Sequence, residues 1–191
     1  MAVQAGQHRL GPDRDRITLR TYREGLASTA GHDLTIGVSR WSGEMTTGDD
    51  GIPTALDVTI DMHSLTVVSG SGGVKPLSDR DRREIAVTAR KVLGAGTHPE
   101  ATFSAKSFEP SGGTASSGIM NGTFTLHGVA KPVRLQVSET APGRYNAVTS
   151  IMQTEHGIKP YTGFFGALKV RNSVDVEVDV DLAAPDGGSG T

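Results

Sequence analysis

Two adjacent residues, His32 and Asp33, are the side chains in this sequence best placed to carry acid–base chemistry. An imidazole held by a neighbouring carboxylate can act as a general base. One hypothesis is therefore an enzyme that uses His32 and Asp33 on a hydrophobic small molecule. The alternative, which we favour, is a polar turn in which Asp33 accepts hydrogen bonds from nearby backbone N–H groups.

Other motifs of enzymes and metal sites are missing from the sequence. None of the six histidines stand at the i, i+4 spacing of a helical zinc site, and the chain has no cysteine. Neither a G-x-S-x-G nucleophile elbow nor a phosphate-binding glycine motif between a strand and a helix occurs. We therefore expect no catalytic residue, no metal site and no cofactor.

A larger set of residues is apolar and suits the lining of a cavity. Methionine adapts its shape to ligands, and aromatic side chains line most small-molecule pockets. The candidates for ligand contact in the strands are Met62, Phe103, Phe108, Phe124 and Met152. The alternative for these residues is an ordinary close-packed core.

The segment 157–167 combines polar and apolar candidates and reads GIKPYTGFFGA. Its glycines and proline indicate a shaped loop. Lys159 suits an anionic or carbonyl head group, Tyr161 can donate a hydrogen bond, and Phe164 and Phe165 can cover the first units of an apolar chain. The alternative is a packed plug at a barrel end. Weaker candidates for the head group are Lys75, Arg80 and Arg82.

The elements that position these residues are mainly strands, because apolar and polar residues alternate in short segments between turn residues. The alternation is most regular near the end of the chain, where Val174, Val176, Val178, Val180 and Leu182 oppose acidic residues. Short connections predict antiparallel pairing. The eight predicted strands span 17–23, 32–45, 55–63, 101–109, 118–127, 132–139, 144–153 and 168–182, and 67–76 is predicted to be a glycine-rich loop.

One segment has a helical period instead. Ser78 precedes DRDRREIAVTARKVL, and Asp81 stands three residues later, which is typical of a capped helix start. The apolar stripe of this helix comprises Ile85, Ala89, Val92 and Leu93. Gly94 and Gly96 end the segment.

Length and composition favour one domain with a sizeable core, because the chain has 191 residues. We expect a flexible segment at 1–15, a barrel domain at 16–182 and a disordered tail at 183–191. The net charge of −2 argues against nucleic-acid binding. No apolar run is long enough to span a bilayer, so we expect no stable membrane insertion. With no export signal visible, a cytoplasmic location is predicted.

Three stretches resemble the YceI-like family of polyisoprenoid-binding, lipocalin-like proteins. They contain Arg80-Asp81 at the helix start, Pro99 with Phe103, and the hairpin LHGVAKPV at 126–133, which is the most specific. The resemblance covers about 16–182. It implies a tunnel that holds a long isoprenoid or fatty amphiphile, no catalysis, and a homodimer.

Taken together, these features predict an all-β fold: a single antiparallel eight-stranded lipocalin-like barrel with one amphipathic helix covering one end. The favoured function is non-catalytic binding, transport or sequestration of a long-chain isoprenoid or similar amphiphilic lipid. The alternatives are the enzyme described above and a ligand-free, stress-related interaction protein.

Overall fold

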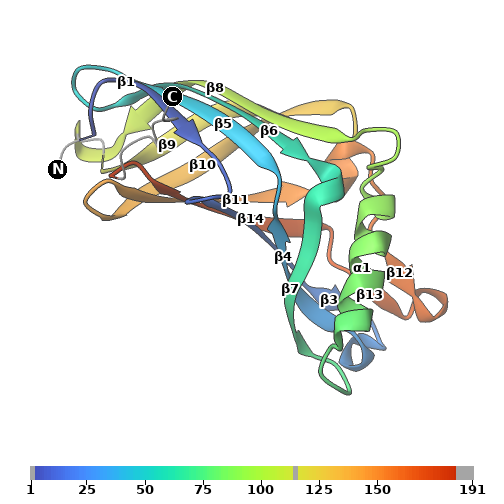
Figure 1. Ribbon diagram of the computed structural model, residues 1–191. Coiled ribbons are helices and arrows are strands. Elements are labelled where there is room, and N and C mark those ends of the chain that lie inside the picture. Colours follow the sequence, from blue (N-terminus) through green and yellow to red (C-terminus); the bar gives the residue numbers. More distant parts are fainter. Residues whose placement is uncertain (1–2, 114–115, 184–191) are drawn as a thin grey trace, which may run out of the picture.

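The computed structural model describes residues 3–113 and 116–183. A large antiparallel sheet of eleven strands curls around an apolar interior (Figure 1). Its strands, in sheet order, are β1 (Gly6–Leu10), β5 (Trp41–Thr47), β6 (Pro53–Asp61), β8 (Glu100–Pro110), β9 (Ser117–Leu126), β10 (Val129–Ala141), β11 (Arg144–Met152), β14 (Ser173–Asp181), β2 (Arg16–Thr21), β4 (His32–Val38) and β7 (Leu65–Gly72).

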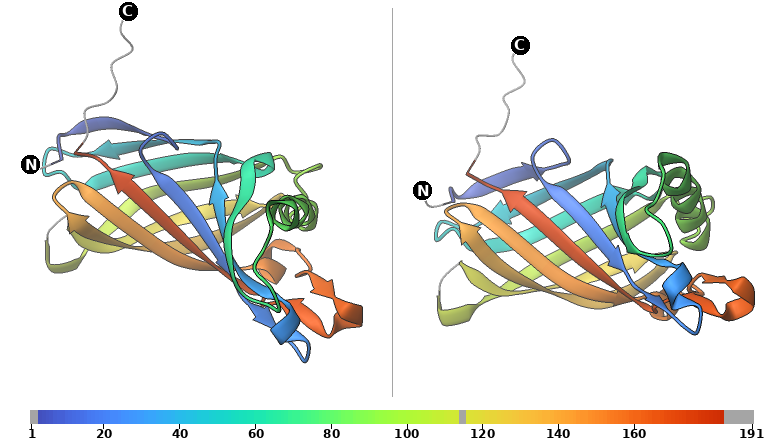
Figure 2. Two further views of the ribbon diagram at one scale, coloured as in Figure 1. Left: turned by 60° about the horizontal axis from the view of Figure 1, so that its bottom comes forward. Right: turned by 90° about the horizontal axis from the view of Figure 1, so that it is seen from below.

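A second, small sheet lies at one end of the large one. It contains β12 (Thr162–Gly163), β13 (Leu168–Val170) and β3 (Arg23–Glu24). The single α-helix of the described chain, α1 (Asp79–Val92), lies at the same end (Figure 1), and Figure 2 shows the small sheet projecting beyond the large one.

The prediction of an all-β fold with one helix is confirmed, but the prediction of an eight-stranded closed barrel is wrong: the sheet has eleven strands, and in the described residues its edge strands β1 and β7 are not paired with each other, so it is curled and open. The predicted strand 32–45 is divided into β4 and β5 by a bend at Ser39 and Arg40. The 3-10 turn Met62–Ser64, which separates β6 from β7, lies at the same level, since the amide of Ser39 donates to the carbonyl of Ser64 and the amide of Asp61 donates to the carbonyl of Arg40. Two further strands of the large sheet, β1 and β7, form where none was expected, and in the small sheet β12 forms within the predicted loop 157–167.

The first of these, β1, corrects the prediction of a flexible segment at 1–15. It pairs with β5 over residues 6–10. The turn that follows is fastened by Asp15, which is buried and accepts hydrogen bonds from the amides of Gly11 (2.9 Å) and Asp181 (2.9 Å). The predicted tail at 183–191 lies, apart from residue 183, outside the described residues.

The second, β7, replaces most of the loop predicted at 67–76 and pairs with β4. Gly70 and Gly72 hide the alternation because they bring no side chains of their own. Side chains from elsewhere fill that space: a Cβ on Gly70 would meet Leu77, and one on Gly72 would meet the guanidinium of Arg23.

The predicted helix is confirmed, with Ser78 as its N-cap. The Ser78 hydroxyl accepts from the amide of Asp81 and the Asp81 carboxylate accepts from the amide of Ser78, which forms a capping box. Arg90 ties the helix to β7 by donating to the carbonyl of Leu65 (2.7 Å). The helix therefore presents its apolar stripe to the interior of the sheet.

Close packing inside the sheet depends on glycines opposite aromatic rings. The ring of Phe103 on β8 covers Gly122 on β9, where a Cβ would lie 2.4 Å from the ring. Phe108 covers Gly118 in the same way. A side chain at either glycine would occupy the place of the ring, so the two glycines allow both rings to pack against the backbone of β9.

Candidate apolar cavity

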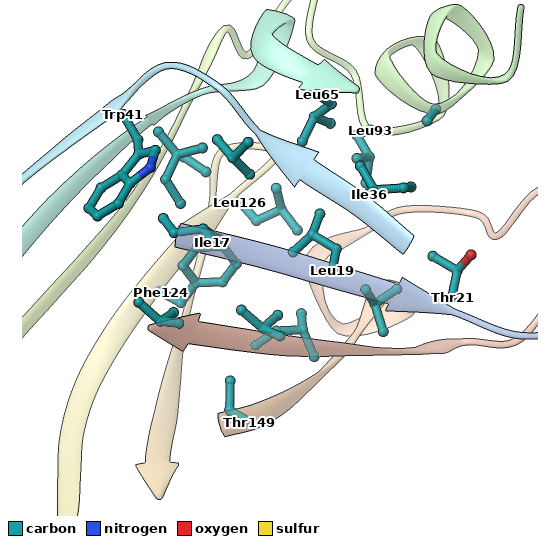
Figure 3. Close-up of a pocket in the computed structure, with 18 of the residues that line it drawn as sticks. Ile17, Leu19, Thr21, Ile36, Trp41, Leu65, Leu93, Phe124, Leu126 and Thr149 are labelled. Atoms are coloured by element: carbon teal, nitrogen blue, oxygen red, sulfur yellow. The ribbon is translucent and has the colours of Figure 1, made fainter. Parts of the chain in front are cut away.

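The interior of the curled sheet contains a cavity of about 570 Å³ (Figure 3). This volume lies in the range of small-molecule binding sites, about 300 to 1,000 Å³. Its lining extends from Tyr145 and Leu182 at one end to α1 and β13 at the other. The cavity therefore follows the length of the large sheet, as a long and narrow ligand would require.

The lining is built by the period-2 alternation of the strands. On β14, Val174, Val176, Val178 and Val180 line the cavity. The residues between them are acidic and belong to the other face, where Asp175 accepts a hydrogen bond from the hydroxyl of Tyr22 (2.9 Å). This bond raises the pKa of the Tyr22 phenol. One face of β14 thus contacts only apolar space, and the other face contacts polar groups.

The helix supplies the lining at one end, where the residues of its predicted apolar stripe line the cavity: Ile85, Ala89, Val92 and Leu93. Figure 3 shows Leu93 together with Ile36 and Leu65 on this side, and Ile17, Leu126 and Phe124 further along. All of these side chains are apolar, so the middle of the cavity offers contact area and almost no polar partners.

Polar groups gather at the helix end of the cavity. Arg23 donates to the carbonyl of Gly31 (2.6 Å) and lies 3.8 Å from Asp33. His32 donates to the carbonyl of Lys75 (2.8 Å), whose ammonium is 4.0 Å from Asp81. The hydrogen bonds from Ser78 lower the pKa of Asp81, and Lys75 adds to this effect. These groups give this end a charged rim.

The opposite end has a phenol. Burial raises the pKa of Tyr145, and nearby Glu139 adds to the shift. The Tyr145 hydroxyl therefore stays protonated at neutral pH and can donate a hydrogen bond beside the lining residue Leu182.

Of the five candidates predicted in the strands, the structure places four in the lining: Met62, Phe103, Phe108 and Phe124. The first three are buried and the last is half-buried. The ring of Phe124 also packs edge-on against His156, with centroids 5.7 Å apart. Tyr161 lines the cavity too, although much of its side chain is exposed.

The prediction that Met152 points inward is wrong. Its side chain is 38 % exposed, and the neighbouring Ile151 is buried and lines the cavity. Tyr145, Ala147 and Thr149 share the inward face with Ile151. The alternation in β11 is therefore one residue out of phase with the prediction, because half-polar residues such as Thr149 and Ser150 do not show which face is apolar.

Three other predicted ligand residues lie outside the lining of this cavity in the described structure. They are Lys159, Phe164 and Phe165, and all three side chains are exposed. Of the weaker candidates, Lys75 lines the cavity. Arg80 pairs with Glu84 (2.8 Å) and Arg82 with Asp79 (3.7 Å), so both serve the helix surface. A role for these residues in head-group binding remains a prediction.

His32 and Asp33 have separate partners. Successive residues of a strand point to opposite faces. His32 lines the cavity and bonds to Lys75, whereas Asp33 accepts from the amide of Arg23 (2.8 Å). Asp33 thus binds backbone, as the favoured alternative expected, although in a strand and not in a turn.

Sequence reasoning missed several lining residues, including Trp41 and Arg23. Trp41 follows the bend at Ser39 and Arg40, where the strand phase changes, and Figure 3 shows its indole at one side of the cavity. The period-2 alternation of β2 and β4 could have identified Ile17, Leu19 and Ile36, since each stands in step with an apolar neighbour two residues away.

Within residues 3–113 and 116–183, no three His, Asp or Glu side chains come together as metal ligands would. In this same part of the chain, no helix has the length and apolar character that crossing a membrane would require.

Comparisons with known proteins agree with this architecture. The family model for the YceI-like domain matches residues 13–182. Among solved structures, *Burkholderia cenocepacia* BcnA is 17% identical, with a TM-score of 0.58, over 86% of this chain and 94% of that one. The *Campylobacter jejuni* YceI protein is 17% identical, with a TM-score of 0.56, over 77% and 82%.

A third similar structure is a polyisoprenoid binding domain from *Saccharophagus degradans*, implicated in plant cell wall breakdown. It is 13% identical, with a TM-score of 0.54, over 92% of this chain and 97% of that one. At these identities the solved structures show a shared fold. No curated protein matched the chain.

Proposed function

Because the chain belongs to the YceI-like domain family, we propose that its cavity binds a long-chain isoprenoid or a similar amphiphilic lipid without chemically changing it. The observation that carries this proposal is the cavity itself, which is about 570 Å³ in volume and lined by aliphatic and aromatic side chains from nearly every strand of the large sheet. The polyisoprenoid-binding description of the *Saccharophagus degradans* domain supports the same ligand class.

The driving force for such binding is the removal of hydrocarbon from water. Each buried CH₂ group contributes about 0.8 kcal/mol, so a chain of many units binds tightly without specific contacts. A lining such as that of β14, with four valines at alternate positions, makes contact along the hydrocarbon chain of the ligand. It offers no hydrogen-bond donor or acceptor that would select a particular head group.

Polar groups at the two ends of the cavity would then select between ligands with different head groups. At the helix end, Arg23, His32 and Lys75 offer donors, while Tyr145 offers a hydroxyl at the other end. We propose that the ligand carries a polar head at the helix end, where cationic and hydrogen-bonding groups are more numerous. Carriage or sequestration of the ligand, and a homodimer, are parts of the same proposal.

Neighbouring residues on β11 allow a sharp test. Ala147 lines the cavity, and Val148 belongs to the outer face. Ala147→Phe adds a ring inside without leaving a void, so we expect the affinity for a fluorescent polyprenyl probe to fall at least tenfold. Val148→Phe places the same ring on the outer face and should bind the probe as the parent does.

Two results would refute the proposal. If the parent protein binds no polyprenyl probe, and organic extraction followed by mass spectrometry finds no lipid in the purified protein, the cavity has no such ligand. If Ala147→Phe binds the probe as well as Val148→Phe does, the probe binds somewhere else on the molecule.

A further inference from the structure

Three large apolar side chains stand exposed at the end of the molecule where the small sheet projects. They are Leu26, 99% exposed, Phe164, 64% exposed, and Phe165, which is fully exposed. We call these three residues the tip, and the two segments that carry them, 22–31 and 157–171, the lobe. Large apolar side chains exposed together on a protein surface mark a site of interaction.

The two segments of the lobe are bound to each other, so the tip is one surface. The amide of Ala27 donates to the carbonyl of Ala167 (2.9 Å), and the amide of Ala167 donates to that of Phe164 (3.1 Å). Strand β13 pairs with both β3 and β12. Leu26 and the two phenylalanines are thus carried by segments that hydrogen bonds join. Figure 2 shows these segments projecting beyond the large sheet.

The backbone of the two phenylalanines at the tip has strained dihedral angles, and both rings are exposed. Phe164 has φ of 48° and Phe165 has φ of 53°, and both values lie in the left-handed region that bulky residues rarely adopt. Glycine or asparagine would fit these positions more easily. Stability of the folded chain alone therefore does not explain two phenylalanines here.

The lobe is also cationic. The segment 157–171 contains Lys159, Lys169 and Arg171 and no acidic residue, and 22–31 adds Arg23 and Glu24. Four cations against one anion give these segments a net charge of +3, which becomes +2 when Asp33, 3.8 Å from Arg23, is included, in a chain whose net charge is −2. Lysine and arginine beside exposed aromatic residues are the usual composition of surfaces that dock on anionic lipid.

The same segments border the cavity. Tyr161, Leu168 and Lys169 line it from the lobe, as do Ala30 and Gly31 from the other segment. A surface in contact with the tip would therefore lie beside the helix end of the cavity. This location matters because a ligand of the class in the proposed function, on which this step rests, resides in lipid and not in water.

We propose that the tip inserts into the surface of an anionic lipid bilayer and so places the helix end of the cavity against the lipid from which a ligand enters. A second copy of the chain fits the tip less well. Stable protein interfaces involve about 20 to 30 residues a side, whereas shallow docking on a bilayer needs only a few apolar groups with cations around them.

The experiment is co-sedimentation of the full chain with vesicles of phosphatidylcholine alone or with about one third phosphatidylglycerol. The parent should bind the anionic vesicles, and added salt should weaken binding through screening. The double variant Phe164→Asn with Phe165→Asn should bind at least tenfold more weakly. Its fold should persist, since asparagine tolerates left-handed φ. Lys159→Glu, which leaves both rings in place, should weaken binding about tenfold.

The matched control is Val68→Thr with Val148→Thr, which makes two exposed apolar residues of the large sheet polar and should bind vesicles like the parent. The proposal is overturned if the parent does not bind anionic vesicles or if the Phe164 and Phe165 variant binds as the parent does. It is also overturned if the parent is a dimer that this variant makes monomeric and neither form binds vesicles, because a second copy then covers the tip.

Binding of the polyprenyl probe without vesicles separates this proposal from the proposed function. Loss of vesicle binding in the tip variant, with probe binding retained, supports docking by the tip. A parent that binds vesicles but takes up no probe also supports docking, while it refutes the lipid-binding function of the cavity.

Discussion

Apolar side chains point in opposite directions in two regions of the molecule. In the large sheet, whose strands form the wall of the cavity, they point inward, and in the lobe they point outward. In the wall, residues such as Val176 and Phe103 turn inward and polar residues turn outward, strand after strand. In the lobe, Leu26 lies in the turn after β3, Phe164 and Phe165 lie in a short 3-10 turn between β12 and β13, and all three side chains are exposed. Burial of apolar area stabilises the wall, whereas the exposed side chains of the tip bury little area and do not stabilise the fold.

This difference separates residues that hold the molecule together from residues available for something else. A strained and exposed aromatic pair persists only where surrounding structure holds it. Here the holding contacts are backbone bonds, such as those from the amide of Val170 to the carbonyl of Tyr161 (3.0 Å) and from the amide of Arg171 to that of Tyr22 (2.8 Å). Substitutions in the wall should therefore change stability, and substitutions at the tip should not reduce it.

The largest loss of stability is expected for Phe103→Ala in the wall. Phe103 is buried and covers Gly122, so its removal should reduce the free energy of unfolding by about 3 to 5 kcal/mol. Phe124→Ala should cost less, because both rings line the cavity but Phe124 is only half-buried, so its removal loses less buried area. Urea unfolding measures both. Equal losses would show that the cavity space near Phe124 is filled by other side chains.

A strand of the wall can be predicted from the sequence only where its side chains alternate clearly between apolar and polar. Segments such as 173–181, with valine at every second position, can be assigned to a strand and a face directly. β7 could not be recognised, because its glycines carry no pattern and the groups that fill their space, Leu77 and Arg23, come from other segments. β1 is polar, and only its pairing with β5 makes it a strand.

The candidate site shows the same limit. Phe103 and Phe124 were predictable as lining because the alternation around them is regular, whereas Met152 stands at the end of a strand, where the phase could not be read. Phe108 lines the same cavity as Phe103 because the register of β8 shifts between Ala105 and Ser107, which period-2 alternation alone does not show. In the lobe, a shaped loop at 157–167 was predictable from its glycines and proline. The direction of Phe164 and Phe165 was not, since it follows from two left-handed φ values that phenylalanine rarely adopts.

A smaller loss is expected for Asp15→Ala, which tests whether the turn between β1 and β2 belongs to the wall. The substitution leaves the amides of Gly11 and Asp181 without their acceptor, and should cost about 1 to 3 kcal/mol in the free energy of unfolding. Asp15→Asn, which keeps one acceptor oxygen, should cost less. If the unfolding curves of both variants match the parent curve, the turn does not contribute to the stability of the large sheet.

Ser78→Ala should have a still smaller effect, about 0.5 to 2 kcal/mol, because it removes the N-cap of α1. The partner Asp81 also predicts a pH dependence. Its hydrogen bonds with Ser78 lower its pKa in the folded state, so its contribution is complete above the unfolded pKa, near pH 4, and is lost as pH falls through the lower folded value. Thermal unfolding should thus become less sensitive to Ser78→Ala as the solution is acidified. A difference between variant and parent that is constant down to pH 2 would contradict the capping box.

The smallest effect, and the one of opposite sign, is expected at the tip. Phe165→Asn replaces a fully exposed ring at a φ of 53° with a residue that adopts the left-handed region more readily. No buried contact is lost, so the free energy of unfolding should stay unchanged or rise by up to about 1 kcal/mol. Phe103→Asn is the counterpart in the wall and should be strongly destabilising, because it removes buried apolar area and places an amide in the interior. Thermal and urea unfolding of the two variants measure the contrast directly. If Phe165→Asn destabilises the protein by more than about 1 kcal/mol, the ring contributes to folding, and the division between a stabilising wall and a lobe that is free for docking does not hold.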